Sequence, residues 1–337
     1  MSGAGPAVGG AGPVELGRLL ARCAFDLTSG ALTCAVSGGP DSLALLALAV
    51  ATGRPVTAVH VDHGLRPGSA GEASVVEGAA GRFGAGFEAR SVTVEPGPNL
   101  EERARQARLA VLPPGALTGH TMDDQAETVL INLLRGAGVE GLAGMRPAGG
   151  RLGHPLLALR RAETHALCTA LGLTPVADPT NDDPAWIRNR VRHEVLPLLA
   201  QVSGRDPVPI LARQAALLAD DADLLIGLAG ALDPEDAPGL RAAPAPLARR
   251  AVRRWLAEAD GDGHPPDSAV VERVLAVARL EAVACQVPGG DHVRRRAGRL
   301  RRVTGADASD ASDASDAAAA SAASAASAAS AGADPLP

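Results

Sequence analysis

The chain of 337 residues contains no lysine and no tyrosine, and only 1% of its residues are aromatic. The lack of lysine excludes the mechanisms that need a lysine side chain, namely the Walker phosphate loop, the pyridoxal Schiff base and the nucleotidyl-lysine intermediate of ligases. Isoleucine and asparagine are scarce too, so residues with AT-rich codons are depleted together. We interpret this as the composition of a GC-rich genome, because the 46% apolar content still suffices for a large buried core.

Cysteines and long apolar runs are also few. Cys23, Cys34, Cys168 and Cys285 are too scattered for a Cys-x-x-Cys redox or zinc pair, and no secretory leader is recognised. We therefore expect a cytoplasmic protein with reduced thiols. The longest uninterrupted apolar run, residues 43–51, is about half of what a bilayer-spanning helix requires, so we expect no membrane-spanning segment.

The net charge of −6 comes mostly from the end of the chain, where the last 34 residues contain five aspartates and no arginine. The remainder is nearly neutral, and its cationic side chains are grouped in the second half. Such groups are typical of a surface that binds nucleic acid. The groups are Arg188, Arg190 and Arg192; Arg249, Arg250, Arg253 and Arg254; and Arg294, Arg295, Arg296, Arg299, Arg301 and Arg302.

The pattern along the chain predicts two folded domains between disordered ends. Residues 1–13 are mostly Gly, Ala and Pro, and residues 304–337 repeat Ser, Ala and Asp, so we expect neither to fold. Residues 14–200 alternate β-rich runs at 32–36, 56–61, 87–94 and 116–118 with helical patterns, which predicts an α/β domain with a doubly wound parallel sheet. Residues 201–303 are dominated by helical apolar repeats and predict a second, mostly helical domain.

The first predicted strand runs into Ser-Gly-Gly-Pro-Asp-Ser at positions 37–42, directly before an apolar helix. A glycine-rich turn at a helix start binds anions, because backbone N–H groups and the helix dipole face the ligand. An ordinary capped turn between strand and helix is the alternative. The string resembles the pyrophosphate loop of the PP-loop ATP pyrophosphatase superfamily. This resemblance implies that ATP is bound by Ser37, Gly38, Gly39, Pro40, Asp41 and Ser42, with Asp41 also a candidate Mg²⁺ ligand.

The second predicted strand ends in His-Val-Asp-His-Gly-Leu-Arg at positions 60–66. At the carboxyl edge of a parallel sheet, beside a phosphate loop, His60 and His63 would lie where the base and ribose of a nucleotide bind. A metal cluster and a surface turn are the alternatives for these two histidines.

The fourth predicted strand ends in Gly-His-Thr-Met-Asp-Asp-Gln-Ala-Glu-Thr at positions 119–128. Asp124 and Glu127 are three residues apart at the start of a predicted helix, so their carboxylates share one face. An acidic turn that only stabilises the helix dipole is the alternative. Because this turn is expected at the same sheet edge as the phosphate loop, we interpret Asp124 and Glu127 as functional.

These strings, with Leu-Arg-Gly-x-Gly-x-x-Gly-Leu-x-Gly-Met at 134–145, resemble the bacterial tRNA(Ile)-lysidine synthetases. The resemblance covers about residues 30–200 and, more weakly, 287–294 with the arginine-rich strand that follows. The family's Arg-Pro-Leu-Leu has His154 at its first position here. The resemblance implies that Arg105 or Arg108 orients phosphate or the activated base. It also implies tRNA binding by Arg188, Asn189, Arg190 and Arg192, with Arg294, Arg295 and Arg296 of the second domain.

The resemblance implies a two-step ligation. ATP adenylates the C2 oxygen of the wobble cytidine in an isoleucine tRNA with a CAU anticodon, and free L-lysine then displaces AMP to form lysidine, which changes codon recognition from AUG to AUA. Mg²⁺ held by Asp41 would neutralise the departing pyrophosphate. Asp124 and Glu127 would bind the cationic lysine and remove its proton. No partner protein is inferred.

Two other functions compete with this one. A PP-loop tRNA thiolase shares the ATP activation but needs cysteines to carry sulfur or an iron–sulfur cluster, and no pair here has a suitable spacing. A catalytically inactive tRNA-binding module would need substitutions in the phosphate loop or the acidic turn, and Ser37, Asp41, Asp124 and Glu127 are all present.

Overall fold

The computed structural model describes residues 13–26, 30–62, 69–93, 100–148, 150–176, 186–259 and 266–303. The chain divides into two compact units, Met1–Asp220 and Asp221–Pro337. Of the ends that we expected to be disordered, residues 1–12 and 304–337 lie outside the described residues, whereas Pro13 is the first residue of a helix. The domain boundary expected after residue 200 stays a prediction. Among the described residues, no helix is both long and apolar enough to cross a membrane.

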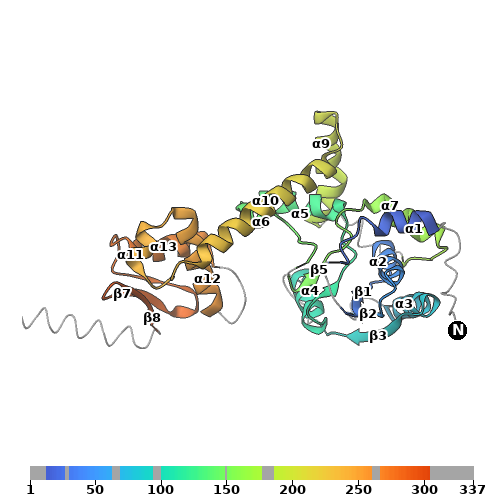
Figure 1. Cartoon of the computed structure of the whole chain (residues 1–337), viewed down its shortest axis with the longest axis horizontal. Coiled ribbons are helices and arrows are strands. Elements are labelled where there is room, and N and C mark those ends of the chain that lie inside the picture. Colours follow the sequence, from blue (N-terminus) through green and yellow to red (C-terminus); the bar gives the residue numbers. More distant parts are fainter. Residues whose placement is uncertain are drawn as a thin grey trace, which may run out of the picture. The chain divides into compact units, whose positions relative to one another are not determined.

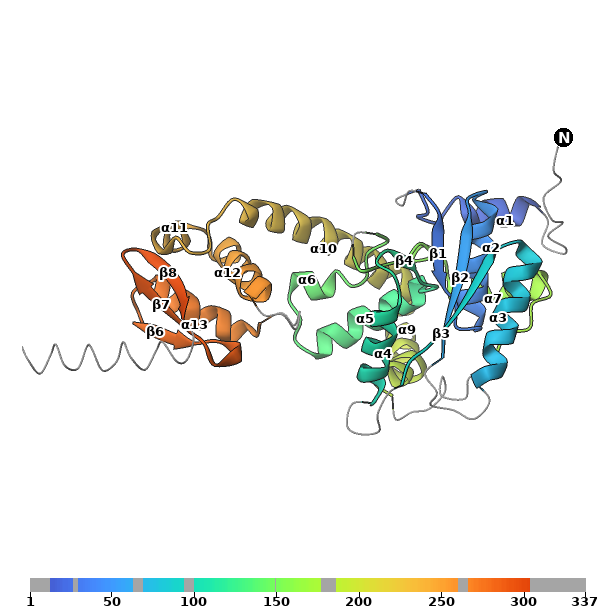
Figure 2. The ribbon, with the colours of Figure 1, turned by 90° about the horizontal axis from the view of Figure 1, so that it is seen from below.

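The first unit is built on a parallel sheet of five strands in the order β3-β2-β1-β4-β5. This order confirms the predicted doubly wound sheet, since the chain starts in the middle and moves outward in both directions (Figures 1 and 2). The register runs from Leu32 opposite Val56 to Ala35 opposite Val59. The strands are β1 (Leu32–Ala35), β2 (Val56–Asp62), β3 (Gly86–Ser91), β4 (Ala116–Leu117) and β5 (Leu152–Gly153).

Helices cover both faces of this sheet, which explains why its central strands are apolar on both sides (Figure 2). One face packs against α1 (Pro13–Leu20), α2 (Pro40–Ala51), α3 (Ser69–Phe83) and α7 (Arg161–Ala170). On the other face, Val59 and Val61 pack near the end of α4 (Leu100–Val111). The long apolar run of the sequence is α2, whose residues from Ser42 to Ala49 are all buried. The run is therefore a central core helix.

A second, smaller core in the first unit holds the helices that carry acidic and basic side chains. It contains Ala126, Leu130, Ile131, Val191, Leu196 and Val208. These residues belong to α5 (Met122–Leu134), the π-helical turn η2 (Val191–Val195), α9 (Leu196–Ser203) and the start of α10 (Pro207–Gly230); α6 (Val139–Leu142) follows α5, and α8 (Ile187–Arg190) precedes η2. This core fixes the first turn of α5 against the basic segment 187–195.

The second unit is mostly helical, as predicted, and it closes with an antiparallel sheet. Its core is formed by small and branched side chains such as Ala251, Val252, Val274 and Leu300. The sheet order is β6-β7-β8. Ala297 and Gly298 both have positive φ, which is the conformation that a tight turn between β7 and β8 requires. The elements are α11 (Ala237–Ala242), α12 (Ala245–Ala259), α13 (Ser268–Ala278), β6 (Ala284–Gln286), η3 (Pro288–Gly290), β7 (His292–Arg296) and β8 (Arg299–Val303).

The cysteines and tryptophans, which are rare in this chain, occur in both units. All four cysteines are free thiols, of which Cys34 and Cys168 are buried. Burial raises the pKa of Cys34 to about 12, so this thiol stays protonated and unreactive at neutral pH. The two tryptophans fall one in each unit, with Trp186 directly before α8 and Trp255 in α12.

Candidate active site

Internal hydrogen bonds hold the loop between β1 and α2. The hydroxyl of Ser42 donates to the Gly39 carbonyl at 2.9 Å and accepts from the Ser37 amide at 3.2 Å. Gly38 has a φ of +90°, a conformation that side chains other than glycine rarely adopt. Its carbonyl accepts a hydrogen bond from the Val176 amide at 3.0 Å. These contacts hold the turn between β1 and α2, and its role as an anion site stays a prediction.

Gly119, at the end of β4, brings the second motif against this loop. A β-carbon at this position would lie 2.6 Å from the carbonyl oxygen of Asp41 and 2.9 Å from the amide of Ser42. Any side chain here would push the first turn of α2 away from the sheet. The glycine therefore allows the phosphate loop and the start of α5 to share one edge of the sheet, as expected from the strand order.

The carboxylate of Asp41 points toward α7. Its Oδ1 accepts a hydrogen bond from the hydroxyl of Thr164, and Nε2 of His165 lies 3.8 Å from the same oxygen. Its Oδ2 lies 3.7 Å from Nε of Arg161. Burial raises the pKa of Asp41 above its usual value, and the negative charge of Asp124 raises it further. The hydrogen bond from Thr164 lowers the pKa but does not outweigh these two effects.

The acidic turn of α5 contains two buried carboxylates. Asp124 is 7% exposed, and its Oδ2 accepts from both the amide and the hydroxyl of Thr121 at 2.8 Å. This is a helix-capping arrangement, so the alternative that the turn stabilises the helix start is partly correct for Asp124. Glu127 has no exposed surface and takes no part in that cap.

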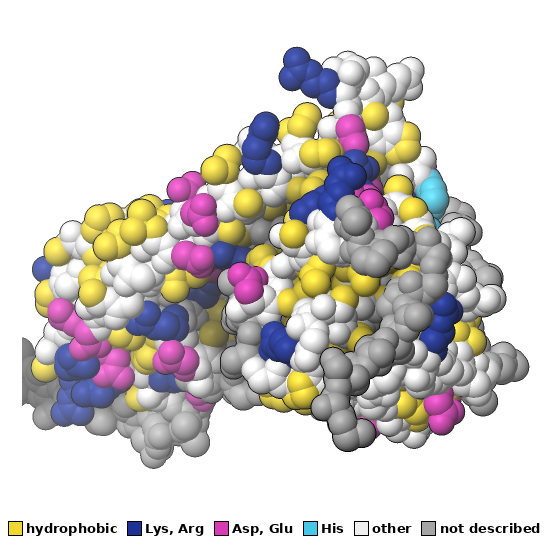
Figure 3. All heavy atoms as spheres, turned by 45° about the vertical axis from the view of Figure 1, so that its right-hand side comes forward, with side chains coloured by type: hydrophobic (Ala, Val, Ile, Leu, Met, Phe, Trp, Pro, Cys, Tyr) yellow, Lys and Arg dark blue, Asp and Glu magenta, His cyan; other side chains and the backbone are white. Residues whose placement is uncertain are grey.

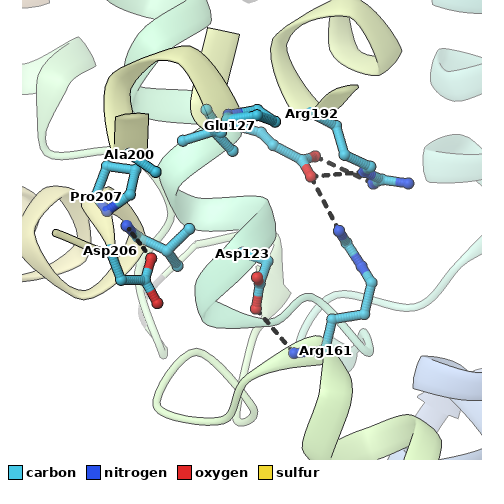
Figure 4. A pocket seen from close by; sticks show the side chains of 10 residues that line it. Asp123, Glu127, Arg161, Arg192, Ala200, Asp206 and Pro207 are labelled. Carbon is cyan, nitrogen blue, oxygen red and sulfur yellow. Dashed lines mark hydrogen bonds and ion pairs between the residues drawn. The ribbon is translucent and has the colours of Figure 1, made fainter. Parts of the chain in front are cut away.

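Three guanidinium groups converge on Glu127 (Figure 4 shows two of them). Arg192 donates to its two oxygens at 2.8 and 3.2 Å, and Arg161 donates to Oε1 at 3.1 Å. Nε of Arg188 lies 3.3 Å from Oε2. Arg161 also donates to Asp124 at 2.7 Å, so one guanidinium lies among Asp41, Asp124 and Glu127.

The surroundings of Asp124 keep it ionised. Burial raises the pKa of Asp124, but Arg161 lowers it, and His120, the Thr121 amide and Arg188 lower it further, to about 2. Nearby cations and hydrogen bonds therefore outweigh the cost of burying the charge. Asp124 is a fixed negative charge over the whole physiological pH range.

A further ion pair joins the acidic turn to the start of α10. Arg160 donates to Asp123 at 3.0 and 3.1 Å and also pairs with Asp206. Asp206 in turn accepts from the Val208 amide at 3.0 Å and caps α10. Burial raises the pKa of Asp123, but the hydrogen bond from Arg160 is among the larger effects that together hold it below its usual value.

Some of these side chains line a cavity of about 220 Å³ (Figure 4). One wall is charged and the other is aliphatic. Three carboxylates and two guanidiniums reach the cavity. The lining consists of Asp123, Glu127, Arg161, Arg192, Leu196, Pro197, Ala200, Asp206, Pro207 and Val208.

Of the residues predicted to contact the nucleotide or the activated base outside the phosphate loop, the structure describes the side chain of His60. His60 is 2% exposed, and its Nδ1 lies 3.0 Å from the carbonyl of Val36, the residue directly before the phosphate loop. In this position the His60 ring contacts the backbone at the end of β1, directly before the phosphate loop. His63 and the side chains of Arg105 and Arg108 on α4 lie outside the described residues.

The predicted tRNA-binding arginines divide into two groups. Arg188 and Arg192, four residues apart on one helix face, turn inward to Glu127. Arg190 points away and pairs with Glu194 at the surface, and Asn189 is buried. In the second unit Arg295 and Arg296 are exposed at the end of β7, while Arg294 is partly covered. Basic and acidic side chains alternate on the face of the second unit seen at the left of Figure 3.

Arg161 lies at the centre of the site, and the sequence alone did not indicate this residue. The available signal was its position, since Arg160 and Arg161 stand at the start of a helix, where the dipole disfavours cations. Two arginines at such a place indicate nearby carboxylates. The carboxylates come from α2 and α5, which are distant in sequence from α7.

Comparison with known proteins gives a consistent result. Residues 15–199 match the model of the PP-loop domain, and residues 236–301 match the TilS substrate binding domain. A tRNA(Ile)-lysidine synthase of Mycolicibacterium paratuberculosis is 47% identical over 66% of this chain and 73% of that protein. One from Thermobifida fusca is 41% identical over 80% of this chain and 89% of that protein. A solved structure of a U34-tRNA thiolase from Methanococcus maripaludis aligns with 18% identity and a TM-score of 0.48 over 61% of this chain and 79% of that one.

Proposed function

Because this chain belongs to the tRNA(Ile)-lysidine synthase family, we propose that it uses ATP to attach free L-lysine to C2 of the wobble cytidine in an isoleucine tRNA with a CAU anticodon. The observation that carries the proposal is the position of Arg161. Its guanidinium faces Asp41 of the phosphate loop on one side and Asp124 and Glu127 on the other. An ATP site and an acidic amine site therefore share one wall, as a reaction that first uses ATP and then an amine requires.

The phosphate loop binds the triphosphate of ATP. The loop turn at Gly38 and Gly39 and the start of α2 present backbone N–H groups to phosphate oxygens, and Ser37, which is exposed, adds a hydroxyl. Adenylation of the C2 oxygen converts a poor leaving group into AMP. The loop residues orient the triphosphate for that attack.

Asp41 suits a Mg²⁺ ion bound together with pyrophosphate. Mg²⁺ in nucleotide sites takes one or two carboxylates, with phosphate oxygens and water completing its shell. Asp41 is one partly exposed carboxylate at the helix start beside the loop. Bound there, the ion would neutralise charge on the departing pyrophosphate. Thr164 orients the carboxylate, and Arg161 balances its charge.

The cavity beside Glu127 suits the free lysine. Asp123, Glu127 and Asp206 offer carboxylates to the two ammonium groups of lysine, and Leu196, Ala200 and Val208 offer an aliphatic wall to its methylene chain. Arg192 can pair with the lysine carboxylate, and Asp206 with its α-ammonium group. Asp124 and Glu127 hold the negative charge toward which the ε-ammonium is drawn.

The tRNA is held by charge outside this site. The exposed Arg295 and Arg296 of the second unit, with Arg190 of the first, supply contacts to the phosphate backbone. Arg105 or Arg108 remains our choice for orienting the activated cytidine. Such backbone contacts position the tRNA, and the anticodon supplies the selection.

The test is incorporation of labelled lysine into a CAU isoleucine tRNA transcript, with and without ATP and Mg²⁺, followed by mild alkali that removes ester-linked amino acids. Label that requires ATP and survives alkali supports the proposal. ATP cleavage that depends on tRNA but gives no label would contradict it and favour sulfur transfer. Binding of tRNA without ATP cleavage would contradict it in favour of a binding module.

A further inference from the structure

One arginine joins two of the three carboxylates that line the cavity. Asp123 belongs to the first turn of α5, and Asp206 stands directly before α10 (Figure 4). Arg160, directly before α7, donates hydrogen bonds to both side chains. Its own side chain is described by the structure and is not part of the cavity lining. Arg160 therefore acts on the cavity through the two carboxylates that it holds.

The two carboxylates are bound differently. Both oxygens of Asp123 accept from Arg160, at 3.0 and 3.1 Å, and Oδ2 also accepts from the Arg161 amide at 2.8 Å. The Asp123 side chain is 16% exposed. Asp206 accepts from one nitrogen of Arg160 and from the Val208 amide at 3.0 Å, and its side chain is 49% exposed. Asp123 is therefore engaged on both oxygens by one guanidinium, whereas Asp206 keeps room for a further donor.

This difference limits where the α-ammonium of an amino acid can bind. Asp123 and Asp206 come from different helices, so two open carboxylates would anchor the α-ammonium at two positions. Amino acids of different length could then bring their terminal ammonium to Glu127. Because Arg160 engages Asp123, Asp206 is left as the anchor. The packing of α5 against the start of α10 fixes its distance from Glu127, and a single anchor at a fixed distance rejects shorter chains.

We propose that Arg160 is a positioning residue that determines amino-acid specificity. It withdraws Asp123 from the α-ammonium and leaves Asp206 as the anchor, so that lysine is selected by its length. The inference rests on the proposed function and deepens its second half-reaction. Both partners of the guanidinium belong to the cavity and neither belongs to the phosphate loop, so adenylation should not depend on Arg160. Without Arg160, Asp123 keeps the hydrogen bond from the Arg161 amide and becomes a second anchor.

The test measures amino-acid binding in Arg160→Met, with labelled lysine as the substrate. The KM for lysine is compared with the inhibition constants of ornithine, which is one methylene shorter, and of 6-aminohexanoate, which lacks the α-ammonium. In the wild type we expect lysine to be preferred over ornithine by about tenfold or more. In Arg160→Met this preference should fall by about tenfold, with pyrophosphate release in a single turnover unchanged. The inhibition constant of 6-aminohexanoate should stay the same, because this compound has no α-ammonium for either carboxylate to anchor.

Two further variants separate this role from a loss of structure. Asp123→Asn combined with Arg160→Met removes the second anchor without leaving a buried charge unpaired, so the preference for lysine should return. Arg205→Met removes an exposed cation beside Asp206 and should leave all three constants unchanged. The inference would be overturned by an unchanged preference in folded Arg160→Met, by an equal change for all three compounds, by the same change in Arg205→Met, or by no return of the preference in the double variant. A wild-type protein that transfers no lysine would instead overturn the proposed function.

Discussion

In the first unit three guanidiniums converge on one carboxylate that solvent does not reach, whereas in the second unit arginines pair with acids at the surface. Glu127 is 0% exposed, while Arg299 and its partner Asp233 are 43% and 48% exposed. A buried charge that loses its partner cannot be rehydrated, but an exposed one can. Arginines therefore fix the geometry around Glu127 in the first unit. In the second unit they lie at the surface, where their charge can contact ligands.

The largest effect should come from Glu127→Gln. Three guanidiniums would then face each other around a neutral amide, and we expect the free energy of unfolding to fall by about 3–5 kcal/mol. Transfer of lysine should be abolished, with tRNA binding retained. Urea unfolding and the labelled-lysine assay measure the two effects. The matched control is Glu194→Gln, which removes an exposed partner of Arg190 and should leave both unchanged.

The next largest effect should be a loss of free energy of unfolding at acidic pH, caused by protonation of Asp124. The pKa of Asp124 is about 2 in the fold against an ordinary 3.8, so its ionised form stabilises the fold above about pH 4. This contribution, about 2 kcal/mol, is lost as the pH falls from about 4 to about 2. Asp124→Asn should be less stable at neutral pH and show a flatter dependence in this window. Parallel curves for the two proteins would show that Asp124 is not the group responsible.

A smaller effect is expected from reversing charge on the second unit. Arg295→Glu with Arg296→Glu should weaken tRNA binding by about tenfold or more and reduce its salt dependence, with ATP affinity unchanged. Fluorescence anisotropy over a range of salt concentrations measures both. Arg205→Glu with Arg213→Glu, at exposed positions of the first unit, gives the same change in net charge. Equal weakening by both pairs would mean that only total charge matters.

The smallest effect should follow Arg299→Ala. It removes ion pairs to Asp233 and Glu235 that water can replace, so we expect no measurable change in Tm. Thermal unfolding followed by circular dichroism measures the Tm of the variant and of the wild type. A clear loss of Tm would place the β7–β8 arginines among the structural residues and remove the contrast between the two units.

The sequence predicted the sheet and the acidic turn because both rest on local patterns. Strand and helix periodicity placed four of the five parallel strands, and the spacing of Asp124 and Glu127 placed them on one face. Strand β5 has only two residues, and helix α7 begins at Arg161 directly after Arg160, so neither shows a clear local pattern. The inward direction of Arg188 and Arg192 could not be read from a basic cluster, because it depends on Glu127, which is distant in sequence.

The scarcity of aromatic residues gives this chain a built-in optical probe for each unit. Trp186 lies in the first unit and Trp255 in the second, and there is no tyrosine to contribute background emission. Replacing either tryptophan by phenylalanine leaves a single emitter, so the fluorescence of each variant follows one unit. Unfolding of the two units, and the response of Trp186 beside α8 to ATP, lysine or tRNA, can then be recorded separately in the intact protein without any attached dye.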